Sequence, residues 1–238
     1  NTCTVTGEAE KKTRKAVRRA LRANDHARVL VTGCAAAIDA AFYEALDERV
    51  IYLGTVSKIF APGLRCGWIA APRSIIGKVN LVKQGSDLCG SSFDQIVVEH
   101  YFTDTPWQRT LQRFVRTYKA RRDAMLKALE ENFPPEASWT HPEGGFFVWV
   151  TLPEYMDTGS MLAEALEAGV TYVPGDSFFP GGTRGKNCMR INFSYETPEN
   201  IEEAIRRLAG VIEDRLELYR AFIDAGAIGE TAPKRKSE

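Results

Sequence analysis

Residues 50–72 read VIYLGTVSKIFAPGLRCGWIAAP, and this stretch decides the fold expected for the chain. Two apolar runs, residues 50–53 and 68–71, carry the bulky and branched side chains typical of buried strands. The segment between them contains Gly, Ser and Pro, which favour a turn. The pattern therefore predicts a strand, a polar turn that holds Lys58, and a second strand.

The polar side chains of this turn suggest a cofactor site. A lysine amine can form an imine with an aldehyde. The hydroxyls of Thr55 and Ser57 and the guanidinium of Arg65 are suited to holding a phosphate dianion through charge-assisted hydrogen bonds. An imine-forming amine beside a phosphate grip suggests pyridoxal 5'-phosphate. The alternative interpretation is a surface turn between two core strands.

The same words resemble those of a known family. Residues 54–68, GTVSKIFAPGLRCGW, are similar to the lysine-bearing segment GTFSKTLAPGLRxGW of the class I/II (fold type I) aminotransferases. Four further words follow in the family's order: KQGSDLCGSSFDQ, HPEGGFFVWVTLP, GVTYVPGDSFFPGG and MRINFSY. The resemblance covers about residues 46–222. It is closest to the branch that includes aminoadipate and broad-range amino acid transaminases.

This resemblance implies an α/β fold, namely a truncated fold type I transferase with the end of the large domain and the small C-terminal domain. It implies pyridoxal 5'-phosphate as cofactor and amino-group transfer between an amino acid and a 2-oxo acid. Lys58 would form the Schiff base with the cofactor and afterwards move the substrate's α proton. Thr55, Ser57 and Arg65 would bind the phosphate.

Arg190 is the candidate substrate-binding residue. It lies in the apolar run CMRINF, where an unpaired guanidinium would be costly. The resemblance implies that Arg190 grips the substrate's α-carboxylate with two hydrogen bonds, and the alternative is an internal salt bridge. Lys58 and Arg190 together would define an amino-acid site.

Residues 1–45 lie outside this resemblance. The words NTCTVTGEAEKKTRKAVRRA, RVLVTGCAA and AAIDAAFYEAL resemble the N-terminal domain of radical-SAM tRNA methylthiotransferases. In that family the cysteines that match Cys3 and Cys34 bind an iron–sulfur cluster, which generally takes three or four thiolates. The sequence contains no CxxxCxxC triplet, which binds the catalytic cluster in that family. Methylthiolation is therefore not expected, and an iron–sulfur site at these two cysteines is kept only as an alternative.

The leading segment also contains a basic helix. Thr6, Gly7 and Glu8 are suited to a helix start, and Val17, Ala20 and Leu21 give a narrow apolar stripe. Basic residues outnumber acidic ones seven to two over residues 8–22. We interpret this face as solvated, with RNA contact as the alternative.

Downstream, helical periodicity predicts three helices over residues 91–102, about 107–132, and from Thr197 as N-cap onward. The first helix has Phe93, Ile96, Val97 and Tyr101 on one face. The apolar stripes of the other two are expected to be buried: Leu111, Phe114, Val115, Tyr118, Met125 and Leu129; Ile201, Ile205, Leu208, Val211 and Ile212. The expected organisation is a methylthiotransferase-like fragment (1–45), the remainder of the cofactor-binding large domain (46–105), the small C-terminal domain (106–224) and a polar tail (225–238).

Composition narrows the class of protein. The chain has 238 residues, 31 basic and 31 acidic, and 44% of them are hydrophobic, which suits a globular core. No apolar run approaches the roughly 20 residues that cross a bilayer. Its five cysteines are scattered, so neither a disulfide framework nor a metal site is expected. A cytoplasmic protein without membrane or nucleic-acid partners fits best.

The family resemblance also implies a homodimer that acts on an amino acid and a 2-oxo acid. In that family, sequence upstream of the lysine segment supplies a ring that stacks on the cofactor and an Asp that pairs with its pyridinium nitrogen. No counterpart of this upstream sequence is recognised here, so weak or absent turnover is expected. Two alternatives remain: a tRNA-modifying iron–sulfur fragment, and an inactive fusion product joined near residues 44–50. A third, a regulator that joins a DNA-binding helix-turn-helix to an aminotransferase-like domain, is disfavoured because the leading segment lacks that pattern.

Overall fold

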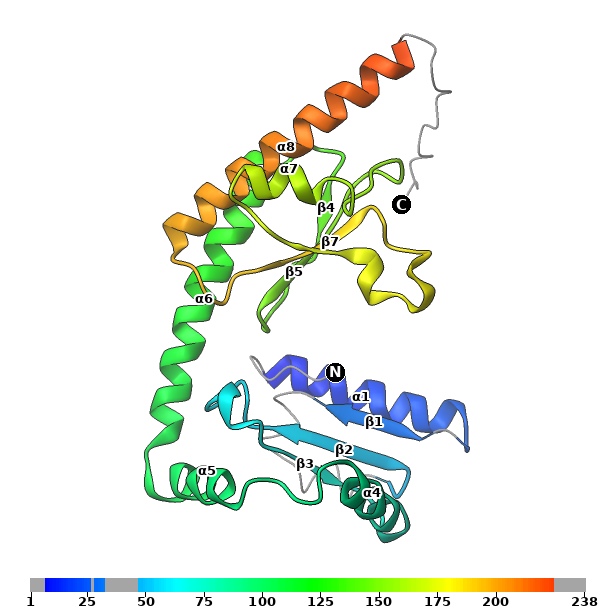
Figure 1. Ribbon diagram of the computed structural model, residues 1–238, viewed down its shortest axis with the longest axis vertical. Helices are drawn as coiled ribbons and strands as arrows, with labels where there is room; N and C mark the ends of the chain where they lie inside the picture. The colour runs from blue at the N-terminus through cyan, green and yellow to red at the C-terminus, as the bar shows by residue number, and fades with distance from the viewer. Residues whose placement is uncertain (1–6, 27, 33–46, 225–238) are drawn as a thin grey trace. The chain divides into compact units, whose positions relative to one another are not determined.

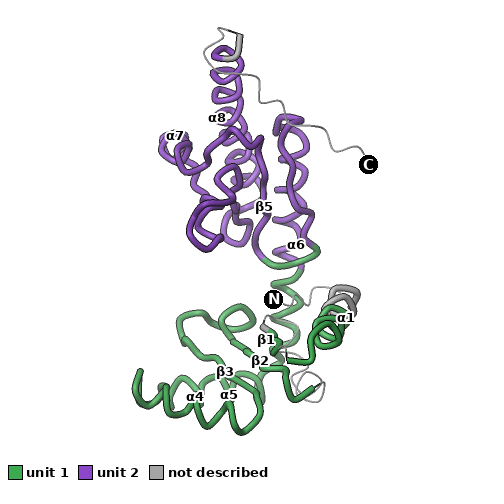
Figure 2. Tube along the Cα trace, turned by 90° about the vertical axis from the view of Figure 1, so that its right-hand side faces the viewer, with its two compact units in different colours: residues 1–115, 143–145 green, residues 116–142, 146–238 purple. Residues whose placement is uncertain are grey.

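A computed structural model describes residues 7–26, 28–32 and 47–224. It divides into two compact units, which Figure 2 colours green and purple. Unit 1 comprises Asn1–Val115 with Glu143–Gly145, and unit 2 comprises Arg116–Pro142 with Phe146–Glu238. Each unit combines a β-sheet with helices (Figure 1).

The sheet of unit 1 has the order β1-β2-β3. β1 (Val29–Thr32) runs parallel to β2 (Val50–Thr55), with Val29 opposite Val50. β3 (Gly67–Ala70) is antiparallel to β2, with Thr55 opposite Gly67. The two strands expected around Lys58 are therefore present, and they bring residues 55 and 67 together at one end of the sheet.

The described core of unit 1 joins the leading segment to these strands. Helix α1 (Gly7–Ala23) supplies two buried side chains, and the strands supply the rest. The buried residues are Val17, Leu21, Val31, Val50 and Tyr52. Ala20, which was expected in the buried stripe, is exposed, because the stripe that meets the sheet is only wide enough for the i, i+4 pair.

Arg49 strengthens this connection. Its Nη1 donates to the backbone oxygens of Leu21 at 3.2 Å, Asn24 at 3.3 Å and Asp25 at 3.1 Å, which are carbonyls at the end of α1. Its Nη2 donates to Asp47 Oδ2 at 2.8 Å, and its backbone N–H donates to Asp47 Oδ1 at 2.9 Å. These side-chain and backbone hydrogen bonds from Arg49 lower the pKa of Asp47 to about 2. One guanidinium thus ties the end of α1 to the start of β2.

Two further helices follow β3. They are α4 (Arg73–Ser86) and α5 (Ser92–Asp104), and Ser91 caps α5 by accepting a hydrogen bond from Asp94 N at 3.2 Å. Neither helix buries a side chain against the described residues. Phe93 and Ile96 are 73% and 51% exposed, so the apolar face predicted for this helix is not buried at these two positions against the described residues.

The sheet of unit 2 has the order β4-β5-β7-β6 and is antiparallel throughout. Its central strands are β5 (Phe147–Thr151) and β7 (Cys188–Asn192). β4 (Ser138–Trp139) and β6 (Val173–Pro174) form short edges. β6 ends at Pro174, which suits an edge strand because proline has no N–H to donate.

Three helices complete unit 2: α6 (Trp107–Asn132), which begins in unit 1, α7 (Leu162–Glu167) and α8 (Pro198–Asp224). Thr197 caps α8 by accepting a hydrogen bond from Asn200 N at 3.3 Å. The core combines Met125, Leu129, Val148, Val150, Met189, Ile191, Ile201, Ile205, Leu208 and Ile212 with further buried side chains. The buried stripes expected on the second half of α6 and on α8 are present, although Val115 is 38% exposed. Within the described residues, no helix has the length and apolar character needed to cross a bilayer.

Two buried polar residues, Thr158 and Tyr172, stabilise the segment around α7 through hydrogen bonds. Thr158 is fully buried, and its hydroxyl donates to the carbonyl oxygen of Cys188 at 2.6 Å. The hydroxyl of Tyr172, a residue that is 6% exposed, donates to the carbonyl oxygen of Thr158 at 2.6 Å. Burial raises the pKa of Tyr172, with Glu164 adding to the rise and Arg215 opposing it.

Because Tyr172 is buried, the free energy of unfolding of unit 2 is expected to depend on pH in the alkaline range. Above about pH 10, the ordinary tyrosine pKa, the unfolded chain loses a proton that native Tyr172 still holds. The stabilisation present below that pH is therefore lost as the pH rises. We expect the free energy of unfolding of unit 2 to fall above about pH 10, as measured by urea titration at a series of pH values. Tyr172→Phe should reduce this decrease in the free energy of unfolding. Tyr195→Phe, at a residue that is 84% exposed, should leave the decrease unchanged. An equal fall in wild type and Tyr172→Phe would refute the assignment.

Candidate functional site

The loop between β2 and β3 holds Lys58 between two buried anchors. Val56 and Ile59 are 2% and 8% exposed, and the ring of Phe60 stacks on that of Tyr101 with centroids 3.7 Å apart. Lys58 itself is exposed. The anchors fix the backbone on both sides of Lys58, so the loop presents its amine outward from the core of unit 1.

The two predicted phosphate-binding hydroxyls lie side by side. Thr55 Oγ1 and Ser57 Oγ are 3.0 Å apart, and Thr55 Oγ1 also accepts from Ser57 N at 3.2 Å. Thr55 Oγ1 can alternatively donate to the carbonyl oxygen of Cys66 at 3.0 Å. A hydroxyl has one proton to donate. When Thr55 donates to Ser57, the proton of Ser57 is therefore left for another acceptor. When Thr55 donates to Cys66 instead, Ser57 can donate to Thr55.

Arg65 lies next to Cys66 and closes the same loop. It ends the 3₁₀ helix η1 (Pro62–Leu64), and its backbone N–H donates to Pro62 O at 3.3 Å. Its φ of 54° lies in the left-handed region, which costs a residue with a side chain more than it costs glycine. Its side chain is exposed, and Nη1 donates to Pro62 O at 3.3 Å. The segment thus carries Lys58, both hydroxyls and a guanidinium within eleven residues that begin at the end of β2.

Arg190 occupies the middle of β7 in unit 2. Its guanidinium carbon lies 4.0 Å from the ring centroid of Phe147 and 4.7 Å from that of Phe178. Its Nε is buried without a hydrogen-bond partner. No carboxylate of the described residues pairs with it, so the internal salt bridge weighed from the sequence is not found there. Sequence reasoning identified the buried cation but missed the two rings, which no spacing rule links to position 190.

Other residues weighed from the sequence contribute less. Gly145 has a φ of 83° and open space where a Cβ would stand, which is the geometry of a turn. Cys188 is buried, Cys66 is half-buried and Cys89 is exposed. Cys3 and Cys34 lie outside the described residues. The part of the chain that is described contains no cluster of three or more His, Cys, Asp or Glu side chains suited to a metal.

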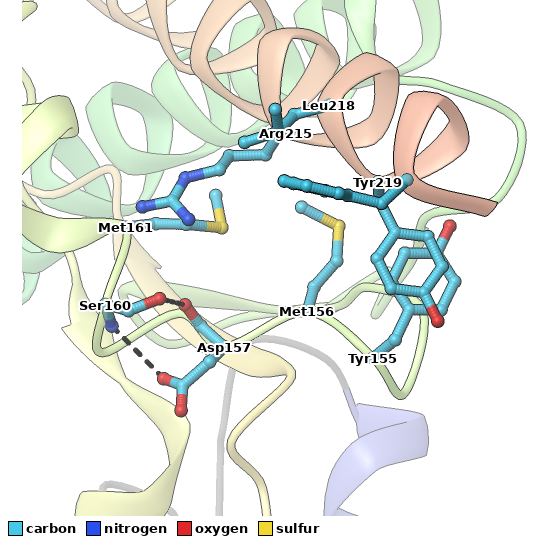
Figure 3. Close-up of a pocket in the computed structure, with 9 residues that line it drawn as sticks. Tyr155, Met156, Asp157, Ser160, Met161, Arg215, Leu218 and Tyr219 are labelled. Carbon is cyan, nitrogen blue, oxygen red and sulfur yellow. Dashed lines mark hydrogen bonds between the residues drawn. The ribbon is translucent and has the colours of Figure 1, made fainter. Parts of the chain in front are cut away.

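Unit 2 also contains a pocket that the sequence did not suggest (Figure 3). It encloses about 210 Å³ beside α8, and the stacked rings of Tyr155 and Tyr219 lie 3.7 Å apart at one side. Its polar groups already have partners. Asp157 Oδ1 accepts from Ser160 N at 3.1 Å, and Arg215 Nε donates to Glu164 at 2.7 Å. We therefore assign no chemistry to this pocket.

Comparison with known proteins places the chain in a family. The profile described as "Aminotransferase class I and II" matches residues 14–208. Aromatic-amino-acid aminotransferase 1 of Thermococcus litoralis is 49% identical over 176 residues, which cover 73% of this chain and 42% of that protein. The 2-aminoadipate transaminase of Thermus thermophilus is 37% identical over 175 residues, covering 74% of this chain and 44% of that protein.

Solved structures of aminotransferases are similar to this chain. The multiple substrate aminotransferase of Thermococcus profundus superposes with a TM-score of 0.77 at 39% identity, covering 87% of this chain and 52% of that one. The Pyrococcus horikoshii kynurenine aminotransferase gives a TM-score of 0.75 at 39% identity, covering 86% and 52%. The α/β fold is therefore that of the fold type I transferases. The chain belongs to the class I and II aminotransferases and spans about half or less of the length of these relatives.

The matches revise the interpretation of the leading segment. The family profile begins at residue 14, so it includes α1 from that residue and all of β1, which the sequence analysis had placed outside the aminotransferase family. The shared core and the Arg49 contacts agree with this assignment. None of the comparisons supports the resemblance of residues 1–45 to tRNA methylthiotransferases.

Proposed function

We propose that this chain carries the lysine loop and the carboxylate-binding arginine of a pyridoxal-phosphate-dependent aminotransferase, which moves an amino group between an amino acid and a 2-oxo acid. The observation that carries the proposal is the segment from Thr55 to Arg65, which is anchored on both sides of Lys58 and also holds Ser57. Relatives named for aromatic amino acids and 2-aminoadipate, and a neighbour solved with PMP, support it.

The residues of the loop fit the anionic end of this cofactor. The donors of Arg65 not used by Pro62 O and the hydroxyl of Ser57 are suited to a phosphate, since charge-assisted hydrogen bonds are the strong ones. Thr55 would orient Ser57 and lend its own hydroxyl. When bound, the cofactor supplies the electron sink that stabilises negative charge at the substrate's α carbon.

Two residues would act on the substrate side. Lys58 Nζ would hold the cofactor through its aldehyde carbon, with the aldehyde oxygen leaving as water, and its free amine would accept the substrate's α proton and return it. Arg190 would bind the α-carboxylate through two N–H groups. Fixing that carboxylate would set which bond at the α carbon is broken.

The remaining expectations are carried forward as part of the proposal. They are an amino acid and a 2-oxo acid as substrates, a homodimer in the cytoplasm, and domain boundaries at residues 105 and 224. Among the relatives, the branch with aminoadipate and broad-range transaminases is favoured. No observation on the described residues favours an iron–sulfur function for Cys3 and Cys34, so we do not propose one.

The direct test is covalent labelling. The full chain is incubated with pyridoxal 5'-phosphate, reduced with borohydride, digested and mapped by mass spectrometry. We expect one pyridoxyl group on the peptide that contains Lys58, and an absorption band of the bound cofactor before reduction. Labelling spread evenly over exposed lysines, with no preference for Lys58, would overturn the proposal.

Arg65 allows the phosphate grip to be tested apart from the backbone. Arg65→Gly should weaken pyridoxal 5'-phosphate binding about ten- to a hundredfold, because charge-assisted hydrogen bonds are lost. It should not lower the free energy of unfolding by more than about 1 kcal/mol, because glycine tolerates the φ of 54°. Leu88→Gly is the matched control, since Leu88 has a φ of 62° and is 74% exposed. Equal binding by Arg65→Gly and Leu88→Gly would exclude Arg65 from the grip.

A further inference from the structure

The charged guanidinium of Arg190 lies between aromatic rings. Among the described residues, no acidic side chain pairs with it. Phe147 and Phe178 approach its guanidinium carbon to 4.0 Å and 4.7 Å from their ring centroids. The electron-rich face of a ring attracts a cation without replacing a strong hydrogen-bond acceptor. The buried Nε of Arg190 consequently has no partner, which is costly for a charged donor.

Strand register explains why Phe147 meets Arg190. Phe147 lies opposite Asn192, and Trp149 lies opposite Arg190, in the antiparallel pair of β5 and β7. Directly opposed residues share a face of the sheet, and so do residues two apart on one strand. Phe147, Trp149 and Arg190 therefore share one face. The opposite face carries the fully buried Val148 and Met189, so Arg190 faces away from the core of unit 2.

The second ring, that of Phe178, belongs to the loop between β6 and β7. Phe178 ends the 3₁₀ helix η2 (Gly175–Phe178). A Cβ at Gly175 would lie 2.5 Å from the carbonyl oxygen of Gly185, so only glycine allows the two ends of the loop to meet this closely. The edge-to-face contact of Phe178 with Trp149, whose centroids are 5.3 Å apart, then holds the ring beside Arg190.

We propose that Phe147 and Phe178 are positioning residues, whose rings fix the guanidinium of Arg190 so that Nε–H and a neighbouring N–H meet one incoming carboxylate. This inference rests on the proposed function, in which Arg190 binds the substrate's α-carboxylate. The rings hold the charge in place while leaving its donors unused, and a carboxylate satisfies two of those donors together. Arg190 therefore needs no protein acid, which would compete with the substrate.

Nitrogen-15 NMR of the arginine Nε–H groups tests the positioning in the full chain. The Arg190 signal is assigned by its loss in Arg190→Lys, and we expect ring currents to shift it away from those of exposed arginines. Phe178→Leu should move it back towards them and Phe178→Tyr should not. Phe178 is 42% exposed, so the fold should tolerate both changes. Phe179→Leu is the matched control: that ring lies 4.8 Å from the guanidinium carbon of Arg184, so it should move the Arg184 signal and leave that of Arg190.

Titration with L-leucine tests the purpose of the positioning. L-Leucine should shift the Arg190 signal, and L-leucinamide, which lacks the carboxylate, should not. The dissociation constant read from this shift should rise about two- to thirtyfold in Phe178→Leu, the range expected for one lost cation–π contact. It should stay unchanged in Phe178→Tyr and Phe179→Leu.

Two results would overturn the inference in different ways. If leucine shifts Arg190 with equal affinity in wild type and Phe178→Leu, the rings do not position the arginine, although its carboxylate role stands. If leucine leaves a ring-sensitive Arg190 signal unmoved, the carboxylate role fails and the inference fails with it. The labelling of Lys58 tests the proposed function independently of both.

Discussion

Replacing Lys58 by alanine is expected to abolish the borohydride-fixed pyridoxyl group on the loop between β2 and β3. Alanine has no amine to bond to an aldehyde carbon, and no base to accept a proton from the substrate. If the chain transfers amino groups, the rate should fall by at least about 10²- to 10⁴-fold, the usual contribution of a positioned general base. Mass spectrometry of the labelled digest measures the first effect, and formation of the 2-oxo acid product measures the second.

The matched control is Lys78→Ala. Lys78 is an exposed lysine on α4 of the same unit. It is not part of the proposed cofactor site. Lys78→Ala should label at the wild-type level. Labelling that survives in Lys58→Ala, or that is reduced equally by both substitutions, would show that the cofactor aldehyde reacts at random with surface amines.

Leu208→Ala is expected to have the largest effect on stability. Leu208 is fully buried on α8 within the core of unit 2. Truncation removes apolar contacts and leaves a cavity that the surrounding strands cannot fill, at a cost of about 2–5 kcal/mol in the free energy of unfolding. Urea unfolding followed by the fluorescence of Trp139 and Trp149, both in unit 2, measures the change.

Leu218→Ala is the control for this substitution. Leu218 lies on the same helix, ten positions further along, and is 50% exposed. Its truncation should change the free energy of unfolding by no more than about 1 kcal/mol, since exposed positions tolerate change. Similar losses from the two variants would mean that α8 does not pack on the sheet through its Leu208 face.

Local sequence was most informative where the signals are short-ranged. The helix predicted over residues 107–132 matches α6, because helical periodicity runs between Pro106 and Pro134. The strands beside Lys58 followed from apolar runs bounded by turn residues. Thr197 and Pro198 fixed the start of α8. In each case the side chains that decide the structure are neighbours in the chain.

Long-range packing was beyond the reach of the same patterns. Helical spacing put Phe93 and Ile96 on one face of α5, yet both are exposed among the described residues, because periodicity defines a face and does not supply a partner for it. Likewise, the words of residues 1–45 suggested a separate fragment. The guanidinium of Arg49 and the parallel pairing of β1 with β2 instead join that segment to the aminotransferase core.

In the candidate site, too, some residues could be identified from local sequence and others only from the tertiary structure. The sequence by itself determined the lysine, the hydroxyls and Arg65, because all of them lie within one loop of eleven positions between Thr55 and Arg65. It also showed that Arg190, in an apolar strand, needs a counterpart. Only the tertiary structure decided that two phenylalanine rings surround this charge, because strand register and a loop closed at Gly175 bring together residues that are 31 positions apart, Phe147 and Phe178.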